Sequence, residues 1–210
     1  MVVPGEEFLA DITTIWTRKL APLAAKSLDI LEIGSFEGAS AIRFLTILPR
    51  STVTCVDPFT GDVLGGESYN GDVATIETRF DSNTAPFGSR VRKLKSRSVP
   101  ALETLARAEA RFDIIYIDGS HVRDDILVDS LLAWPLLADQ GLLMWDDYRG
   151  GSTWPKAQRP KRAIETFLSL HPDHELVHVG YQLFARKVAG GSGSNQFPRP
   201  VRNFLRRRFN

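Results

Sequence analysis

The sequence predicts an α/β fold, a three-layer α/β/α sandwich around a seven-stranded, mostly parallel sheet. Short apolar runs, such as those at 28–33 and 112–117, alternate along the chain with amphipathic helical patterns, which is typical of strands covered by helices on both faces. The last two predicted strands, at 175–179 and 181–188, are separated by Gly180 alone. So short a link predicts a hairpin, and therefore one antiparallel strand at the end of the sheet.

Length and composition are those of one ordinary globular domain. The chain has 210 residues, of which 43% are hydrophobic and 24% charged, and its net charge of +1 points to neither nucleic acid nor a membrane surface as a partner. The single cysteine, Cys55, excludes an intramolecular disulfide. We find no apolar run long enough to span a membrane and no signal peptide, and we therefore expect a cytoplasmic protein.

Three segments are expected along the chain. Residues 1–27 form a helical cover, residues 28–188 the main domain and residues 189–210 a flexible basic tail. Within the cover, residues 6–27 follow the pattern of an amphipathic helix that Pro22 breaks or kinks. We expect this helix to lie over one edge of the sheet or over the mouth of the site.

The stretch at 28–40, LDILEIGSFEGAS, predicts a buried strand, a glycine turn and the start of a helix, which together form a nucleotide-binding crevice by default. Gly34 and Gly38 bracket the turn, where a missing Cβ lets a ligand approach the backbone. Phe36 stands where a dinucleotide fingerprint has its second glycine, so the turn lacks the close approach to a pyrophosphate. Glu32 instead offers a carboxylate, which suits a ligand that carries positive charge.

A second strand is predicted at 51–56 by the alternating, β-branched sequence STVTCV, and it ends at Asp57 and Pro58. An acidic residue about twenty positions after the glycine turn is placed to accept both ribose hydroxyls of an adenosine-containing ligand. Proteins that bind NAD and proteins that bind S-adenosylmethionine share this feature. An Asp before a Pro is also a common way to start a turn.

The rest of the domain continues the alternation of strands and helices. A glycine-rich loop at 60–70 is a candidate lid over the site. The other expected elements are a helix at 72–80, a loop at 81–89, a strand at 91–95, helices at 100–108 and 122–137, a strand at 141–145 and a helix at 162–170.

Two successive predicted strands end in acidic residues. The first runs into Asp118, and the second runs into Asp146 and Asp147. In an open parallel sheet these strand ends lie on the same side, beside the glycine turn. Three carboxylates at one edge repel one another unless they are protonated, paired or bound to a cation. Their oxygen atoms suit Mg²⁺ or Ca²⁺ rather than zinc.

The segment LEIGSFEGAS resembles motif I of the S-adenosylmethionine-dependent methyltransferases with a Rossmann-like fold, and the resemblance extends over residues 28–188. In that family the glycine loop wraps the methionine part of the cofactor, and the turn after the third strand lies near the adenine, here at residues 96–98. The resemblance implies that these residues bind the cofactor: Glu32, Gly34, Ser35, Gly38, Ser40, Asp57, Pro58, Ser98 and Asp118. Ser98 could equally cap the helix that follows it.

The acidic residues resemble those of the small-molecule O-methyltransferases, both the catechol type and bacterial relatives that act on sugars and antibiotic scaffolds. That resemblance implies a Mg²⁺ site of Asp118, Asp146 and Asp147. The catechol enzymes have a Lys base three positions after the first Asp, and this chain has His121 there. We therefore expect methyl transfer to a hydroxyl of a small-molecule acceptor that Mg²⁺ orients, with His121 as the catalytic base.

Other interpretations remain open. Asp118 could belong to a plain turn, and His121 could act as a base without a metal. Asp146 and Asp147 could cap the next segment or pair with Arg149 or Lys156. Glu32, the missing middle glycine and the closing hairpin disfavour an NAD-linked oxidoreductase. Methylases of nucleic-acid amino groups carry Asn/Asp-Pro-Pro-aromatic where this chain has Asp-Gly-Ser-His, so we expect no DNA partner.

The basic tail and the oligomeric state are less constrained. Residues 189–210 end in QFPRPVRNFLRRRFN, which predicts a solvated, disordered end or, alternatively, a short basic amphipathic helix that contacts an acidic partner, a membrane surface or RNA. A non-catalytic protein whose tail recruits a partner is therefore a further hypothesis. A homodimer is compatible with the sequence.

Overall fold

The computed structural model describes residues 6–61, 72–151, 155 and 158–188, with side chains from residue 13 onward. Most of the predicted lid at 60–70, the predicted tail at 189–210 and Lys156 lie outside this part of the chain. Within it, no helix is both long enough and apolar enough to cross a membrane.

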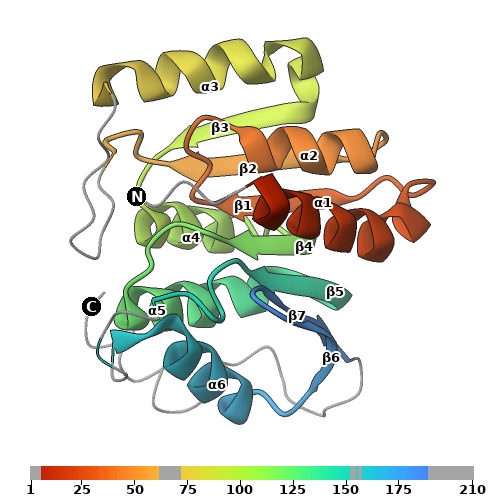
Figure 1. Ribbon diagram of the computed structural model, residues 1–210, viewed down its shortest axis with the longest axis vertical. Coiled ribbons are helices and arrows are strands. Elements are labelled where there is room, and N and C mark those ends of the chain that lie inside the picture. The colour runs from red at the N-terminus through yellow and green to blue at the C-terminus, as the bar shows by residue number, and fades with distance from the viewer. Residues whose placement is uncertain (1–5, 62–71, 152–154, 156–157, 189–210) are drawn as a thin grey trace.

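Seven strands form one sheet in the order β3-β2-β1-β4-β5-β7-β6 (Figure 1). The strands are β1 (Asp29–Ile33), β2 (Thr52–Asp57), β3 (Val91–Lys95), β4 (Phe112–Ile117), β5 (Leu137–Trp145), β6 (His174–Val179) and β7 (Leu183–Lys187). β7 runs antiparallel to both β5 and β6, whereas β1 to β5 pair in parallel. The predicted mostly parallel sheet and its closing hairpin are confirmed.

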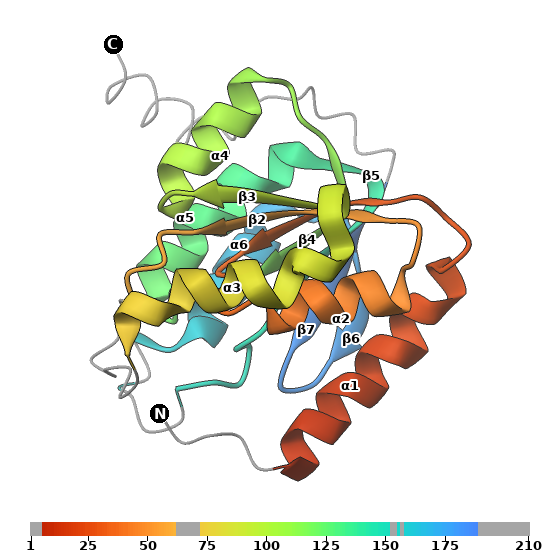
Figure 2. The ribbon, with the colours of Figure 1, turned by 90° about the horizontal axis from the view of Figure 1, so that it is seen from above.

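Helices cover both faces of the sheet and make the three layers (Figure 2). They are α1 (Glu6–Leu20), α2 (Ala39–Ile47), α3 (Ile76–Thr84), α4 (Ser98–Arg107), α5 (Arg123–Ala133) and α6 (Pro160–Leu170). The helices α1, α2 and α3 pack on one face, and α4, α5 and α6 pack on the other. Each face therefore has its own apolar core.

The central strands are apolar without interruption because both of their faces are buried. In β1, Ile30 packs toward α1 and α2, whereas Leu31 and Ile33 pack toward the α4–α6 layer. Successive side chains of a strand point to opposite faces, so both positions need apolar residues here. Glu32 is the one charged residue in β1 with a fully buried side chain.

Three predicted boundaries are wrong for reasons of local geometry. The first helix ends at Leu20, and a 3-10 turn containing Pro22 follows, so the helix does not reach residue 27. The predicted loop at 81–89 instead holds the end of α3 and a 3-10 segment, Ala85–Arg90. Helix α5 ends at Ala133 rather than at 137, before the Trp-Pro turn.

One of the two positions expected for the first helix, over an edge of the sheet, is wrong. Trp16 and Leu20 are fully buried in the core that includes Ile30, Ile114 and Phe184. The helix therefore covers the middle of one sheet face, not an edge of the sheet.

Candidate active site

The site lies at the carboxyl ends of the central strands. β1 pairs with β2 on one side and with β4 on the other. The connection after β1 runs to β2 and the connection after β4 runs to β5, so these two connections lead toward opposite edges of the sheet. Loops that follow strands on the two sides of such a point separate and leave a crevice. Here the crevice is a cavity of about 350 Å³ lined by the loops after β1, β2, β3 and β4.

Gly34 and Gly38 are both required by the backbone of the turn after β1. Gly34 has φ 89°, and a Cβ there would lie 2.2 Å from the carbonyl oxygen of Asp118. Gly38 has φ 88° and precedes α2, and a Cβ there would lie 2.9 Å from Cγ2 of Thr84. Because Gly34 has no side chain, the loop after β4 can pack against the turn, and Gly38 allows α3 to pack there in the same way.

Most residues predicted to bind the cofactor line this cavity. They are Gly34, Ser35, Ser40, Asp57, Pro58, Ser98 and Asp118, and the predicted base His121 lines it as well. Glu32 and Gly38 do not line it. The structure thus brings together residues that follow four different strands, and two of the predicted residues, Glu32 and Gly38, lie outside the cavity lining.

Two backbone amides hold the Asp57 carboxylate in place. Its Oδ2 accepts a hydrogen bond from the Phe36 amide at 2.8 Å, and its Oδ1 accepts one from the Phe59 amide at 2.6 Å. Each carboxylate oxygen has a second lone pair, so the side chain keeps the capacity to accept two hydroxyl groups.

Glu32 lies behind the glycine turn with no exposed surface. Burial raises the pKa of its carboxyl, and the nearby hydroxyls of Ser40 and Ser35 lower it in part. Within the described residues neither of its oxygens reaches a partner with full hydrogen-bond geometry, and the Ser35 hydroxyl is likewise without one. A buried acceptor next to two cavity-lining hydroxyls fits a ligand that carries an ammonium group.

Ser98, which lines the cavity, is the first residue of α4 and not its N-cap, which is Arg97. Asp129 of α5 also lines the cavity, although sequence reasoning missed it. Burial raises the pKa of Asp129 to about 7, and a hydrogen bond with Ser98 opposes this effect. The available signal was its position on the buried face of α5, with Ile126 and Ala133.

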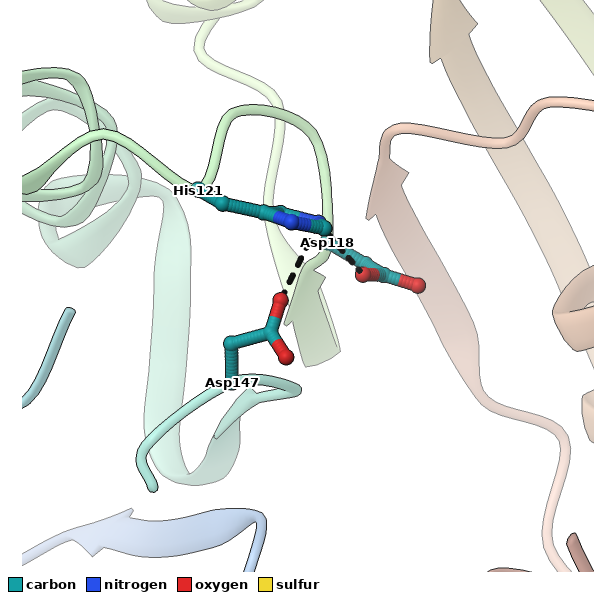
Figure 3. A group of neighbouring side chains, drawn as sticks. All are labelled: Asp118, His121 and Asp147. Atoms are coloured by element: carbon teal, nitrogen blue, oxygen red, sulfur yellow. Dashed lines mark ion pairs between the residues drawn. The ribbon is translucent and has the colours of Figure 1, made fainter. Parts of the chain in front are cut away.

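Asp118 and His121, which line the cavity, form a cluster with Asp147, and the candidate ligand atoms of the three residues all lie within 4.8 Å of one another (Figure 3). Nε2 of His121 is 3.0 Å from Oδ2 of Asp147 and 3.9 Å from Oδ1 of Asp118. The contact with Asp147 lacks hydrogen-bond geometry, since that Oδ2 is buried and makes no hydrogen bond within the described residues, and it is an ion pair only when the imidazole is protonated.

Asp146, the third predicted metal ligand, lies beside this cluster and is held by neutral donors. Its Oδ1 accepts hydrogen bonds from the Tyr116 hydroxyl at 2.6 Å and from Nε2 of Gln182. Tyr181 donates in the same way to Oδ1 of Asp147 at 2.6 Å. Sequence reasoning missed these three donors, since Tyr116 looks like a core residue and the other two lie in the hairpin.

The electrostatics of these carboxylates favour a cation. Desolvation, followed by the charges of Asp146 and Asp147, raises the pKa of Asp118 well above its usual value. Desolvation and the charge of Asp147 also raise the pKa of Asp146. In the described part of the chain, His121 is the only basic side chain that forms an ion pair with them. Three crowded carboxylates with hard oxygen atoms and so little compensation fit a divalent cation.

Comparison with known proteins decides the family. A family model described as a methyltransferase domain matches residues 31–148, more than half of the chain. The chain belongs to this methyltransferase family. The matched segment includes the glycine turn and both strands that end in the acidic residues, so the resemblance predicted from these motifs is confirmed.

Individual relatives are distant. The O-methyltransferase hkm8 of Aspergillus hancockii is 28% identical to this methyltransferase over 134 residues, which cover 63% of this chain and 47% of that protein. The chain spans about half the length of the curated relatives it matches.

Two solved structures show the same fold. The O-methyltransferase TomG of Streptomyces achromogenes, in complex with SAM, has a TM-score of 0.62 at 20% identity, over 86% of this chain and 81% of that one. The MycE methyltransferase of the mycinamycin pathway, in complex with Mg and SAH, has a TM-score of 0.62 at 17% identity, over 87% of this chain and 51% of that one. These likenesses confirm the predicted Rossmann-like methyltransferase fold.

Proposed function

We propose that this protein is an S-adenosylmethionine-dependent O-methyltransferase that methylates a hydroxyl of a small molecule with the assistance of Mg²⁺. One observation carries the proposal. Asp118 and His121 line the cavity and also belong to the acidic cluster, so a ligand in the cavity and a cation at the cluster would be neighbours. Methyl transfer needs this adjacency, because donor and acceptor must be held in line.

The cavity offers a partner for each part of S-adenosylmethionine, which supplies the methyl group on a sulfonium. Asp57 would accept the ribose hydroxyls through its remaining lone pairs. Ser98 and Asp129 would line the adenine end. Glu32 would attract the ammonium group from behind Ser35 and Ser40. The complexes of TomG with SAM and of MycE with SAH support this assignment.

Asp118, Asp146 and Asp147 would hold Mg²⁺, which binds an acceptor hydroxyl and lowers its pKa. The complex of MycE with Mg supports this site. The geometry favours Asp118 and Asp147 as ligands, because one carboxylate oxygen of each lies close to Nε2 of His121 (Figure 3). Asp146 would complete the set from its position against Tyr116.

His121 would accept the proton of the hydroxyl. Its side chain is 31% exposed, lines the cavity, and has the Asp147 carboxylate at 3.0 Å to stabilise the imidazolium that forms. A metal-independent transferase with the same base is the alternative, and it differs in needing no divalent cation.

A calorimetric titration with S-adenosylhomocysteine tests the cofactor assignment without knowledge of the acceptor. We expect micromolar binding that Asp57→Ala abolishes, while Asp81→Ala, which removes an exposed carboxylate of α3, leaves binding unchanged. A folded protein that does not bind S-adenosylhomocysteine would refute the proposed activity. Manganese binding, measured in parallel, separates the metal-assisted from the metal-independent form.

A further inference from the structure

A chain of hydrogen bonds joins the first helix to Asp146, beside the acidic cluster. Nε1 of Trp16 in α1 donates to Oε1 of Gln182 at 2.8 Å, and Nε2 of Gln182 donates to Oδ1 of Asp146. Trp16 is fully buried and Gln182 is 1% exposed. Both residues lie outside the segment 31–148 that matches the methyltransferase domain.

The direction of this chain is fixed by chemistry. An indole N–H only donates, so the amide oxygen of Gln182 must face Trp16. The amide NH₂ of Gln182 must then face Asp146 and Tyr116, whose hydroxyl lies 3.5 Å from it. A side-chain amide could otherwise rotate by half a turn and present its oxygen to the carboxylate, which would repel it.

Two hydrogen-bond donors meet at one carboxylate oxygen of Asp146. Its Oδ1 accepts from both Gln182 and Tyr116, which occupies both lone pairs of that oxygen. Because Oδ1 accepts both hydrogen bonds, it carries no proton and is held toward Tyr116 and Gln182. Oδ2 is the oxygen that remains to bind a cation.

We propose that Trp16 and Gln182 are positioning residues for the cation site, with Trp16 acting through the orientation of the Gln182 amide. This inference rests on the proposed function, because it assumes that Asp146 binds the metal. The first helix then has a role beyond packing, since Trp16 determines that Gln182 presents its NH₂ group, and not its oxygen, to Asp146. Partners of this kind typically change metal affinity by about 10- to 100-fold.

The test measures Mn²⁺ affinity of the full chain by electron paramagnetic resonance of the free ion. Trp16→Phe removes the N–H and keeps a ring against Phe44 and Tyr116. Gln182→Met removes both hydrogen bonds at similar length. We expect Gln182→Met to raise the Kd for Mn²⁺ by about 10-fold or more, and Trp16→Phe to raise it by a smaller factor.

A double-mutant cycle distinguishes positioning from general destabilisation. If Trp16 acts through Gln182, Trp16→Phe adds no further loss of affinity to Gln182→Met. The matched control is Trp145→Phe, which removes another buried indole hydrogen bond, donated to Ser130 Oγ at 2.8 Å on the opposite sheet face. We expect this control to lower the melting temperature and to leave the Kd for Mn²⁺ unchanged.

The outcomes separate the inference from the proposed function. Two results would overturn the inference and leave the metal site standing. One is a Trp16→Phe variant that binds Mn²⁺ as tightly as the wild type. The other is a loss of Mn²⁺ affinity on Trp16→Phe that is the same in the wild-type protein and in Gln182→Met. Trp16→Phe decides the matter alone if Gln182→Met does not fold. No Mn²⁺ binding by the wild-type protein would refute the metal site and the inference together, while S-adenosylhomocysteine binding by the same sample would still support the methyltransferase.

Discussion

The Phe36 amide donates a hydrogen bond to Oδ2 of Asp57 at 2.8 Å, and this bond joins the glycine turn after β1 to the end of β2. Phe36 has a positive φ of 45°, an uncommon backbone conformation for a residue with a side chain. The Asp57 carboxylate therefore helps to hold the turn in the shape that forms one wall of the cavity.

Asp57→Asn should weaken both the turn and the cofactor site. An Asn offers one acceptor oxygen, whereas Asp57 accepts from the amides of Phe36 and Phe59 through two different oxygens. One amide is left facing an NH₂ group, at a cost of about 1–3 kcal/mol. Urea denaturation should show this loss, and calorimetry should show weaker S-adenosylhomocysteine binding. Wild-type stability would contradict the role of these two hydrogen bonds.

Gly34→Ala should destabilise the protein far more than Gly88→Ala. Both glycines have positive φ, but a Cβ at Gly34 would lie 2.2 Å from a backbone oxygen, whereas a Cβ at Gly88 would meet nothing within 4 Å. The control therefore has the backbone strain alone, about 1–3 kcal/mol, and Gly34→Ala adds a clash that only movement of the β4 loop can relieve. Equal losses in chemical denaturation would show that the contact with Asp118 is unimportant.

Asp129→Asn should remove a pH dependence of stability. The pKa of Asp129 rises from 3.8 to about 7 in the folded protein, so between these values the folded state binds more protons than the unfolded state. Wild-type stability should therefore fall as pH rises from about 4 to about 7, by at most about 4 kcal/mol from this group.

The variant lacks this ionisable group, so the stability of Asp129→Asn relative to wild type should increase over the same pH range. Urea denaturation at several pH values measures that difference. A difference that does not change with pH would mean that the buried carboxyl titrates normally.

Asp147→Asn should separate cation binding from cofactor binding. Asp147 belongs to the acidic cluster but does not line the cavity, whereas Asp118 does both. Asp147→Asn should therefore lose Mn²⁺ binding and retain S-adenosylhomocysteine binding, while Asp118→Asn should weaken both. In EDTA, Asp147→Asn should also raise the melting temperature, because the charge of Asp147 opposes ionisation of Asp118 and Asp146. Full Mn²⁺ affinity in Asp147→Asn would remove it from the metal site.

Features that depend on residues close together in the chain were predictable from the sequence. Alternating apolar runs predicted the strands, and β3 and β4 begin and end where they were expected. The glycine turn and the acidic residues that follow β4 and β5 predicted the place of the site, since parallel strands bring their carboxyl ends to one edge.

Tertiary structure alone decided which distant side chains support that site. Trp16, Gln182 and Asp129 come from α1, the hairpin and α5, and each fits an ordinary local pattern of a helix or turn. Their roles depend on contacts across the fold, such as the hydrogen bond between Trp16 and Gln182. Local patterns record burial and backbone preference, but the orientation of one side chain toward another is set only when the separate elements pack together.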